Sequence, residues 1–301
     1  MIRTFTLALL CSMSLGGLAA TPQSIHVVKK GNAAPATGKA ASAQPIDKVD
    51  YRVTYATKFV NDTTKRDSLG HYIYLDDEMR LDIGSSVSKF YSARSTVYDK
   101  WLKDKVSRGE TDFTNPPAHA QMLWVVYRNY PKGETSFLSS AMLNNYRISE
   151  KTVTPQWTIG ADTCTLLKYH CTKAETRFKG RNWTVWFTED IPLDYGPWKL
   201  SGLPGLILKA EDAQRQYCFE AKGLEQVDGK EDITLVKNYK KYEPVSQKEF
   251  DKVNRTTTVN DAIAAAGISI SFDSVKNTDE ADDFMKKMKA VPPYNPIEIA
   301  E

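Results

Sequence analysis

The chain has 301 residues, of which 41% are hydrophobic and 26% are charged, as in ordinary globular proteins. Its formal net charge of +3 gives no electrostatic basis for binding nucleic acid, so we predict no nucleic-acid partner. The length suits one large β domain or two small ones, and the pattern of elements has to decide between them.

The first 20 residues have the features of a secretory signal peptide. Arg3 supplies a positive charge, residues 7–18 are apolar, and small residues at 17–20 offer a cleavage site. The apolar run is shorter than the roughly 20 residues that span a bilayer, and no other stretch of the sequence is long and apolar enough. We therefore expect an exported protein that does not span a membrane and is periplasmic, associated with the outer membrane, or secreted.

Residues 21–48 are rich in Ala, Pro, Gly, Lys and Ser, which is typical of a flexible linker. The folded domain is expected to cover residues 49–301. From Val49 to Val60 apolar and polar side chains alternate, and this pattern predicts a half-buried strand.

Further short strands follow, separated by turn residues. A break between two of them is expected at Asp76-Asp77. Strands this short and closely spaced favour antiparallel pairing. The predicted strands after the first are 71–75, 78–83, 89–92, 122–127, 135–138, 146–150, 157–159, 163–174, 181–190, 206–210, 216–221 and 233–236.

Residues 96–106 change to helical spacing, with an apolar stripe that we expect to pack over the concave face of the sheet. Thr96 and Asp99 resemble a capping box at its start. Ser246 and Glu249 form a capping-box pair before a second short helix, and residues 261–266 and 279–289 predict two more. The predicted fold is α+β: a predominantly antiparallel, strongly curved, half-barrel-like sheet packed with a few helices.

Three cysteines remain after removal of the signal peptide, namely Cys164, Cys171 and Cys218. On one regular strand, Cys164 and Cys171 would point to opposite faces, so a bond between them requires an intervening turn or bulge. A Cys171–Cys218 disulfide across neighbouring strands is one interpretation, and three free thiols are another.

No motif identifies a catalytic centre. The four histidines lack paired spacing, so we predict no metal site and no cofactor. The weak catalytic candidates are Glu189, Asp190 and Asp194, which would have to converge in a pocket for acid–base chemistry. Solvated turn carboxylates are the simpler interpretation.

The stretch from Cys171 to Asp212 holds three of the six tryptophans and the densest Gly/Pro punctuation. Its hexapeptide at 202–207 spells GLPGLI, and over roughly residues 49–299 the chain resembles the GLPGLI family of Bacteroidetes envelope proteins. The candidate family-motif and binding residues are Arg181, Trp186, Gly196, Pro197, Trp198, Gly202, Leu203, Pro204, Gly205, Leu206 and Ile207.

This resemblance implies an envelope role, in the neighbourhood of TonB-dependent outer-membrane receptors, and supplies no catalytic residues. The hexapeptide is either a structural turn with a core strand or a loop that contacts a ligand or partner. Our leading hypothesis is an exported, non-enzymatic accessory protein that binds an apolar ligand or an outer-membrane partner. The alternatives are a periplasmic hydrolase that uses the clustered carboxylates and a purely structural envelope protein.

Overall fold

The computed structural model describes residues 26–29, 44–265, 268–271 and 278–299. The predicted signal peptide and most of the predicted linker lie outside these ranges. The chain divides into two compact units, and every site discussed below belongs to the second. The first unit is Met1–Ala40, Ala141–Leu143 and Lys252–Pro292, and the second is Ala41–Ser140, Asn144–Asp251 and Pro293–Glu301.

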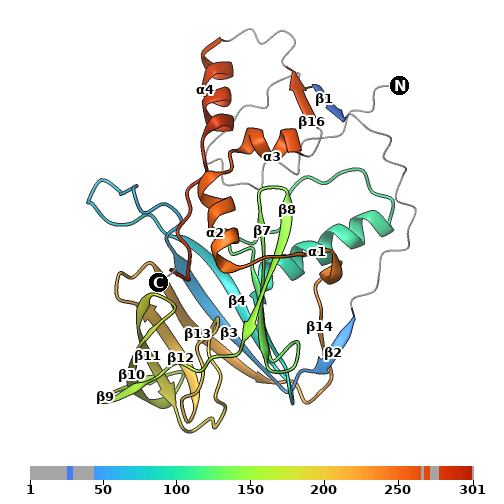
Figure 1. The fold of residues 1–301 in the computed structure, drawn as a ribbon. Coiled ribbons are helices and arrows are strands. Elements are labelled where there is room, and N and C mark those ends of the chain that lie inside the picture. The colour runs from blue at the N-terminus through green and yellow to red at the C-terminus, as the bar shows by residue number, and fades with distance from the viewer. Residues whose placement is uncertain (1–25, 30–43, 266–267, 272–277, 300–301) are drawn as a thin grey trace. The chain divides into compact units, whose positions relative to one another are not determined.

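The second unit is built on one 12-stranded sheet (Figure 1). Its strands are β3 (Tyr51–Phe59), β4 (Leu75–Ile83), β5 (Ser88–Ser92), β6 (Val125–Arg128), β7 (Glu134–Ala141), β8 (Asn144–Lys151), β9 (Thr158–Leu166), β10 (Tyr169–Phe178), β11 (Arg181–Thr188), β12 (Leu206–Asp212), β13 (Tyr217–Gln226) and β15 (Glu243–Pro244). They are ordered β15-β8-β7-β6-β5-β4-β3-β13-β12-β11-β10-β9.

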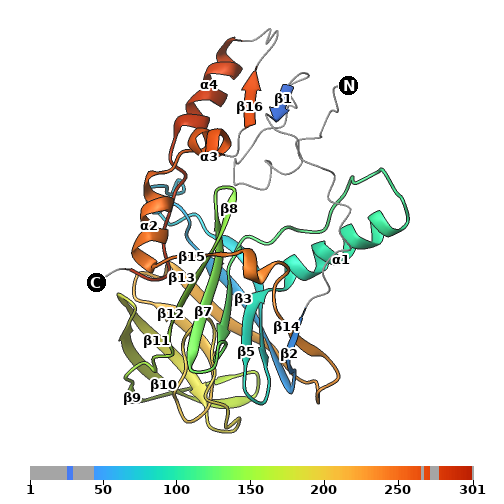
Figure 2. The same cartoon turned by 45° about the vertical axis from the view of Figure 1, so that its right-hand side comes forward.

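The predicted α+β class with a mainly antiparallel sheet is confirmed. The pairs from β7 through to β9 are antiparallel, and β15 pairs in parallel with β8. The sheet is open and curves along its length, as Figures 1 and 2 show. Register shifts between β9 and β10, between β11 and β12, and between β13 and β3 contribute to this curvature, because extra residues in one strand of a pair bend it locally.

Several strand predictions are wrong in their boundaries, and the strand predicted at 71–75 is not formed, since β4 begins at Leu75. The break expected at Asp76-Asp77 does not occur, since both residues lie inside β4, opposite Lys58 and Thr57 of β3. The single strand expected at 163–174 is a hairpin of β9 and β10. Its turn uses Leu167 and Lys168, both with positive φ (50° and 73°), and the absence of glycine there hid the turn from sequence analysis.

Two stretches of the predicted linker form strands. In the first unit, β1 (His26–Lys29) pairs antiparallel with β16 (Ile268–Ser271). In the second unit, β2 (Pro45–Lys48) pairs antiparallel with β14 (Asp232–Thr234). Asp47 attaches β2 to the turn before β5, because its carboxylate accepts hydrogen bonds from the backbone N–H groups of Ser86 and Val87 (2.8 and 2.9 Å).

The helix predicted at 96–106 is present as α1 (Ala93–Ser107). It begins three residues earlier than expected, after Ser92, so the Thr96–Asp99 pair does not cap it. The expected packing of its apolar stripe over the sheet is also wrong. Within α1 only Ala93 is buried, Val97 and Val106 are 50% and 61% exposed, and the helix projects from the sheet (Figure 2).

The helix α2 (Gln247–Thr256) starts at the predicted capping box. The Ser246 N–H donates to Glu249 Oε2 (2.8 Å), and the Glu249 N–H donates to Ser246 Oγ (3.2 Å). Phe250 packs edge-on against the rings of Phe137 and Tyr146. The other two predicted helices, α3 (Val259–Ala265) and α4 (Thr278–Lys289), lie in the first unit.

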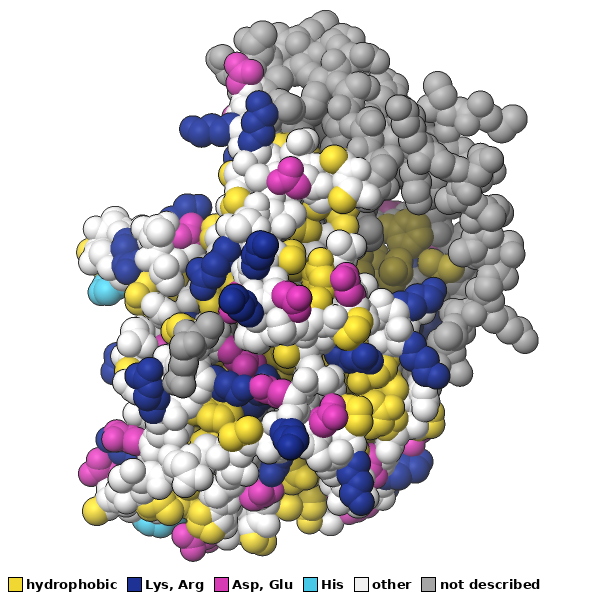
Figure 3. All heavy atoms as spheres, in the orientation of Figure 1, with side chains coloured by type: hydrophobic (Ala, Val, Ile, Leu, Met, Phe, Trp, Pro, Cys, Tyr) yellow, Lys and Arg dark blue, Asp and Glu magenta, His cyan; other side chains and the backbone are white. Residues whose placement is uncertain are grey.

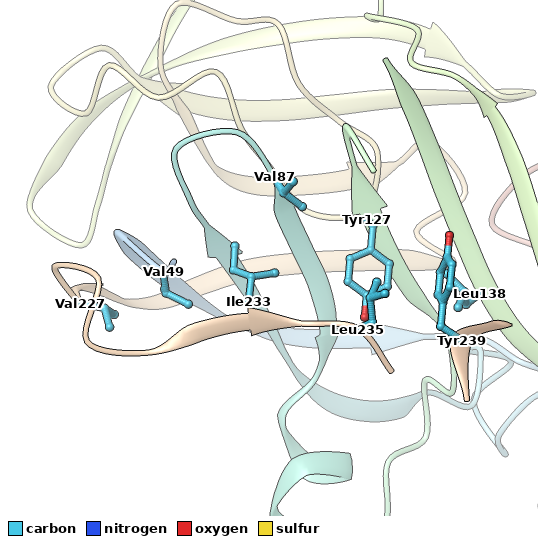
Figure 4. Close-up of a cluster of buried hydrophobic side chains, with 8 residues drawn as sticks. All are labelled: Val49, Val87, Tyr127, Leu138, Val227, Ile233, Leu235 and Tyr239. Atoms are coloured by element: carbon cyan, nitrogen blue, oxygen red, sulfur yellow. The ribbon is translucent and has the colours of Figure 1, made fainter. Parts of the chain in front are cut away.

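Apolar side chains from the sheet and from the segment after β13 form a buried cluster. Figure 4 shows Tyr127 facing Leu235 and Tyr239 from the other side of this cluster. The Tyr127 hydroxyl donates to the Thr234 carbonyl (3.0 Å), so the ring is buried without leaving its polar end unsatisfied. The members of the cluster are Val49, Val87, Tyr127, Leu138, Val227, Ile233, Leu235 and Tyr239.

Asp77 fastens the loop before β6 to the sheet. Its buried carboxylate accepts hydrogen bonds from the backbone N–H groups of Glu78, Gln121 and Met122 and from Ser92 Oγ, at 2.7–2.8 Å. These bonds account for a charged residue inside β4, because a buried carboxylate is stable when its lone pairs are satisfied.

Replacing Asp77 with Ala should lower the free energy of unfolding by about 2–4 kcal/mol, because the Met122 N–H would stay buried without an acceptor. Its neighbour Asp76 is the matched control. The Asp76 side chain is exposed and pairs with Arg94, so Asp76→Ala should cost less than about 1 kcal/mol. Urea unfolding of both variants measures this, and equal losses would contradict the role given to Asp77.

Candidate functional site

The hexapeptide at 202–207 forms a tight turn followed by the start of β12. Leu203, Leu206 and Ile207 are buried, and the N–H groups of the last two donate to the carbonyls of Ile191 and Tyr195 (3.0 Å each). The Ile207 carbonyl in turn accepts a hydrogen bond from the buried Tyr55 hydroxyl (2.8 Å). This arrangement is that of a structural turn with a core strand.

The glycines of this region are required by close contacts. A Cβ atom on Gly205 would lie 1.9 Å from the Thr188 carbonyl oxygen, and one on Gly196 would lie 2.8 Å from the Ile207 side chain. Gly202 has a φ of +90°, which is strained for any residue with a side chain. The glycines of this region are therefore explained by close backbone packing. Within the hexapeptide, Gly202 and Pro204 are exposed.

Arg181 is buried and serves the fold. Its guanidinium donates to the Asp212 carboxylate (2.8 Å), to the Gln216 side chain (3.1 Å) and to three acceptors in residues 295–297. All five of its N–H groups are thereby satisfied. No donor is left for an anionic ligand.

The three candidate catalytic carboxylates lie in the connection between β11 and β12. Asp194 pairs with Arg128 (3.1 Å), whereas Glu189 and Asp190 are exposed. None of the three lines either of the two cavities described below. In the part of the chain that the structure describes, no three His, Cys, Asp or Glu side chains are grouped to hold a metal ion.

The proposed Cys171–Cys218 disulfide is wrong. All three cysteines of the domain are free, and β11 and β12 separate β10, which carries Cys171, from β13, which carries Cys218. Cys171 instead lies directly opposite Cys164 in the β9–β10 hairpin. The interpretation with three free thiols agrees with the structure.

Sequence analysis missed a cluster of four charged residues, because they come from four distant segments. Lys199 Nζ contacts Glu150 (2.8 Å) and Glu298, and Lys179 Nζ contacts the same two carboxylates (2.5 and 3.6 Å). Burial alone would raise the pKa of Glu150, but Lys199 and Lys179 outweigh it and lower that pKa. We call Glu150, Lys179, Lys199 and Glu298 the charged cluster.

A cavity of about 10 Å³ adjoins the charged cluster, which is room for one water molecule. Trp198 lines it and has a φ of +58°. Its ring contacts those of Trp183 and Phe178 at centroid distances of 5.5 and 5.7 Å, in a tilted arrangement. Its buried indole N–H has no hydrogen-bond partner. The charges of the cluster neutralise one another and the space is small, so the cluster is built to stabilise the fold.

A second, open hollow of about 170 Å³ lies between β4, α1 and the loop after α1. Next to it, the rings of Tyr98, Trp101, Phe113 and His119 contact one another at centroid distances of 4.6–6.2 Å. The hollow is lined by Glu78, Ala93, Arg94, Val97, Pro117 and Ala118.

The aromatic residues inside the sheet pack against one another. Tyr55, Phe90 and Phe219 are buried, the Phe90 ring contacts the other two, and the Trp183 ring lies tilted against that of Phe219. These rings form part of the buried core. On the exterior, acidic and basic side chains interleave over the face drawn in Figure 3.

Trp186 differs from the other five tryptophans. In the described part of the chain, which includes all six, each of the others makes a ring contact or donates an indole hydrogen bond, whereas Trp186 does neither. It is half-buried on the outer face of β11, because Trp183, Val185 and Phe187 take the inner face. Lys173 of β10 and Lys209 of β12 lie directly beside it in the sheet register.

Residues 133–249 match the model of the PNGase F-II N-terminal domain family, described as "N-glycanase peptide, N-terminal domain". Two crystal structures of PNGF-II, in the P21 and C2 space groups, are also similar to this chain, with identities of 17% and 18% and TM-scores of 0.41 and 0.42. Each match covers 67% of this chain and 32% of the PNGF-II chain, so this chain spans about a third of their length. No curated protein matches the sequence.

The resemblance to the GLPGLI family is therefore wrong. The hexapeptide lies inside the segment that matches the PNGase F-II domain family. Glycine is required at position 205 because the Thr188 carbonyl leaves no room for a side chain, and three aliphatic side chains of the hexapeptide are buried. Local packing requirements of this kind do not identify a family.

None of the helices in the described residues combines the length and the apolar content that crossing a membrane requires.

Gly205→Ala should lower the free energy of unfolding by about 2–4 kcal/mol, because the added Cβ would overlap the Thr188 carbonyl. Gly223 in β13 is the matched control. A Cβ there meets no atom within 4 Å, so Gly223→Ala should stay within about 0.5 kcal/mol of wild type. Chemical denaturation compares the two, and a tolerated Gly205→Ala would contradict the packing account.

Glu150→Gln should reduce stability at neutral pH, and its difference from wild type should shrink as the pH falls below 4.5, the ordinary pKa of the group. The sign follows from the lowered pKa of Glu150 in the folded protein. Stabilisation by the carboxylate is complete above the unfolded pKa and is lost as the folded group protonates. Unfolding curves at a series of pH values test this, and a difference that does not change with pH would refute it.

Proposed function

We propose that this chain is an exported glycan-binding protein that acts through the outer face of its sheet around Trp186 and has no catalytic centre of its own. Support for a glycan ligand comes from the match of residues 133–249 to a domain family named for an N-glycanase. Support for export comes from the predicted signal peptide. The matched segment contains Trp186 and its neighbouring strands.

The unpartnered indole of Trp186 is the observation that carries this proposal. A sugar ring presents an apolar C–H face that packs on an aromatic ring, and its hydroxyls need hydrogen-bonding groups at the rim. Trp186 offers both an accessible ring and an N–H that is not used within the described protein. The other indoles are committed to internal contacts.

The side chains beside Trp186 supply the polar rim. Lys173 pairs with Glu175 (2.9 Å) and Lys209 pairs with Glu220 (3.6 Å), so the two lysine ammonium groups beside Trp186 are held near the sheet. Ammonium groups donate and carboxylates accept, and sugar hydroxyls need both kinds of partner. Because the groups stand on a sheet, a sugar meets a largely preformed surface.

A second candidate function is contact with a partner protein through α1, as an outer-membrane accessory protein would require. It is favoured by the exposed Val97 and Val106 and by the neighbouring rings of Tyr98, Trp101 and Phe113. Exposed apolar surface of this kind often marks a protein contact.

Binding of the purified protein to an array of N-glycans and bacterial polysaccharides tests the proposal. We expect Trp186→Ala to weaken binding at least about tenfold, because the lost stacking is worth about 1.4 kcal/mol or more. Trp101→Ala is the matched control, since Trp101 is also half-buried but packs on Tyr98 and Phe113.

The outcomes separate the two surfaces. Retained binding in Trp101→Ala together with loss in Trp186→Ala supports the outer-face site. The opposite pattern would move the site to α1 and reject the role of Trp186. If the wild-type protein binds no glycan, the proposed function fails.

A further inference from the structure

Two cysteines lie directly opposite each other in the β9–β10 hairpin. Cys164 of β9 and Cys171 of β10 are register partners, between the pairs His170–Thr165 and Thr172–Thr163. Opposed residues in antiparallel strands present their side chains on the same face, with Cα atoms about 4.5–5.5 Å apart. A disulfide accepts Cα separations of about 4.4–6.8 Å, so rotation of the two side chains is enough to bring the sulfur atoms together.

We propose that Cys164 and Cys171 form a reversible disulfide that ties the edge strand β9 to β10. The proposal is independent of the proposed glycan binding. It depends on the hairpin turn at Leu167 and Lys168, which places on neighbouring strands two residues that would point apart on one strand.

The two thiols differ in access, and this sets the order of the chemistry. Cys171 is fully buried and Cys164 is partly exposed. With oxidised glutathione as the oxidant, the Cys164 thiolate attacks one glutathione sulfur and releases the first glutathione thiolate. The Cys171 thiolate then attacks the Cys164 sulfur and releases the second. In total, two thiols are oxidised and one glutathione disulfide is reduced to two glutathione thiols.

Burial slows this reaction at neutral pH. It raises the pKa of the Cys164 thiol and raises the pKa of the Cys171 thiol to about 11. Since the thiolate is the attacking species, the bond should form faster as the pH rises towards that value.

The bond would act on an exposed edge. β9 is the last strand of the sheet, and most of its residues are exposed. An edge strand with one neighbour is held by fewer contacts than an inner strand and is open to pairing with other chains. A covalent tie to β10 would hold β9 in register.

Peptide mapping of the whole chain tests the proposal without any substitution. After incubation with oxidised glutathione, alkylation and trypsin digestion, cleavage at Lys168 separates residues 152–168 from residues 169–173. We expect these two peptides to be joined by a disulfide that disappears with reductant. Cys218, in the peptide 216–222, is the internal control and should be alkylated or carry glutathione.

Two results would overturn the proposal. One is that both hairpin cysteines are still free thiols, and are therefore alkylated, after equilibration with oxidised glutathione at about pH 8.5, the reference pKa of a free thiol. The other is that Cys218 is found joined to either of them. A Cys218→Ser variant that keeps the 164–171 link, with a Tm several degrees higher when oxidised than when reduced, would support it further.

Discussion

The second unit depends on one buried charge. Arg181 stands at the start of β11 with its side chain removed from water, and such a charge is tolerated when every donor has an acceptor. Asp212 neutralises it from the next strand, and the last residues of the chain supply three oxygen acceptors. The same segment carries Glu298 to the charged cluster and places the Ile299 N–H on the Lys179 carbonyl (3.1 Å). The guanidinium thus fixes the position of the chain end, and the chain end completes the guanidinium's surroundings.

Local periodicity was enough to predict most of the sheet. The alternation from Val49 to Val60 is found as β3, and the strand predicted at 181–190 is found as β11. Periodicity failed where an element's partner is decided elsewhere. The apolar stripe of α1 has helical spacing, but spacing cannot tell whether a second surface covers it. The Asp76-Asp77 pair resembled a turn because three of the four hydrogen-bond donors to Asp77, on Ser92, Gln121 and Met122, are distant in sequence.

The candidate sites were harder to predict than the fold, because each joins segments that are far apart. Nothing near Lys199 in sequence indicates Glu298, and Arg181 finds Asn295 across 114 residues. The opposed cysteines required knowledge of a turn made by two residues with positive φ and no glycine. By contrast, the alternation of side chains along β11 puts Trp186 on the face opposite Trp183. Its lack of an internal partner could be found only when the other five tryptophans had been placed.

The long stretch of sequence between Arg181 and its acceptors has a consequence for biosynthesis. A ribosome releases the β11 segment while residues 295–299 are still unmade, so Arg181 cannot yet reach the acceptors that allow it to be buried. The barrier to closing the sheet around that charge therefore falls when residues 295–297 emerge. The surroundings of Arg181 therefore stay open while the 114 residues up to Asn295 are being made.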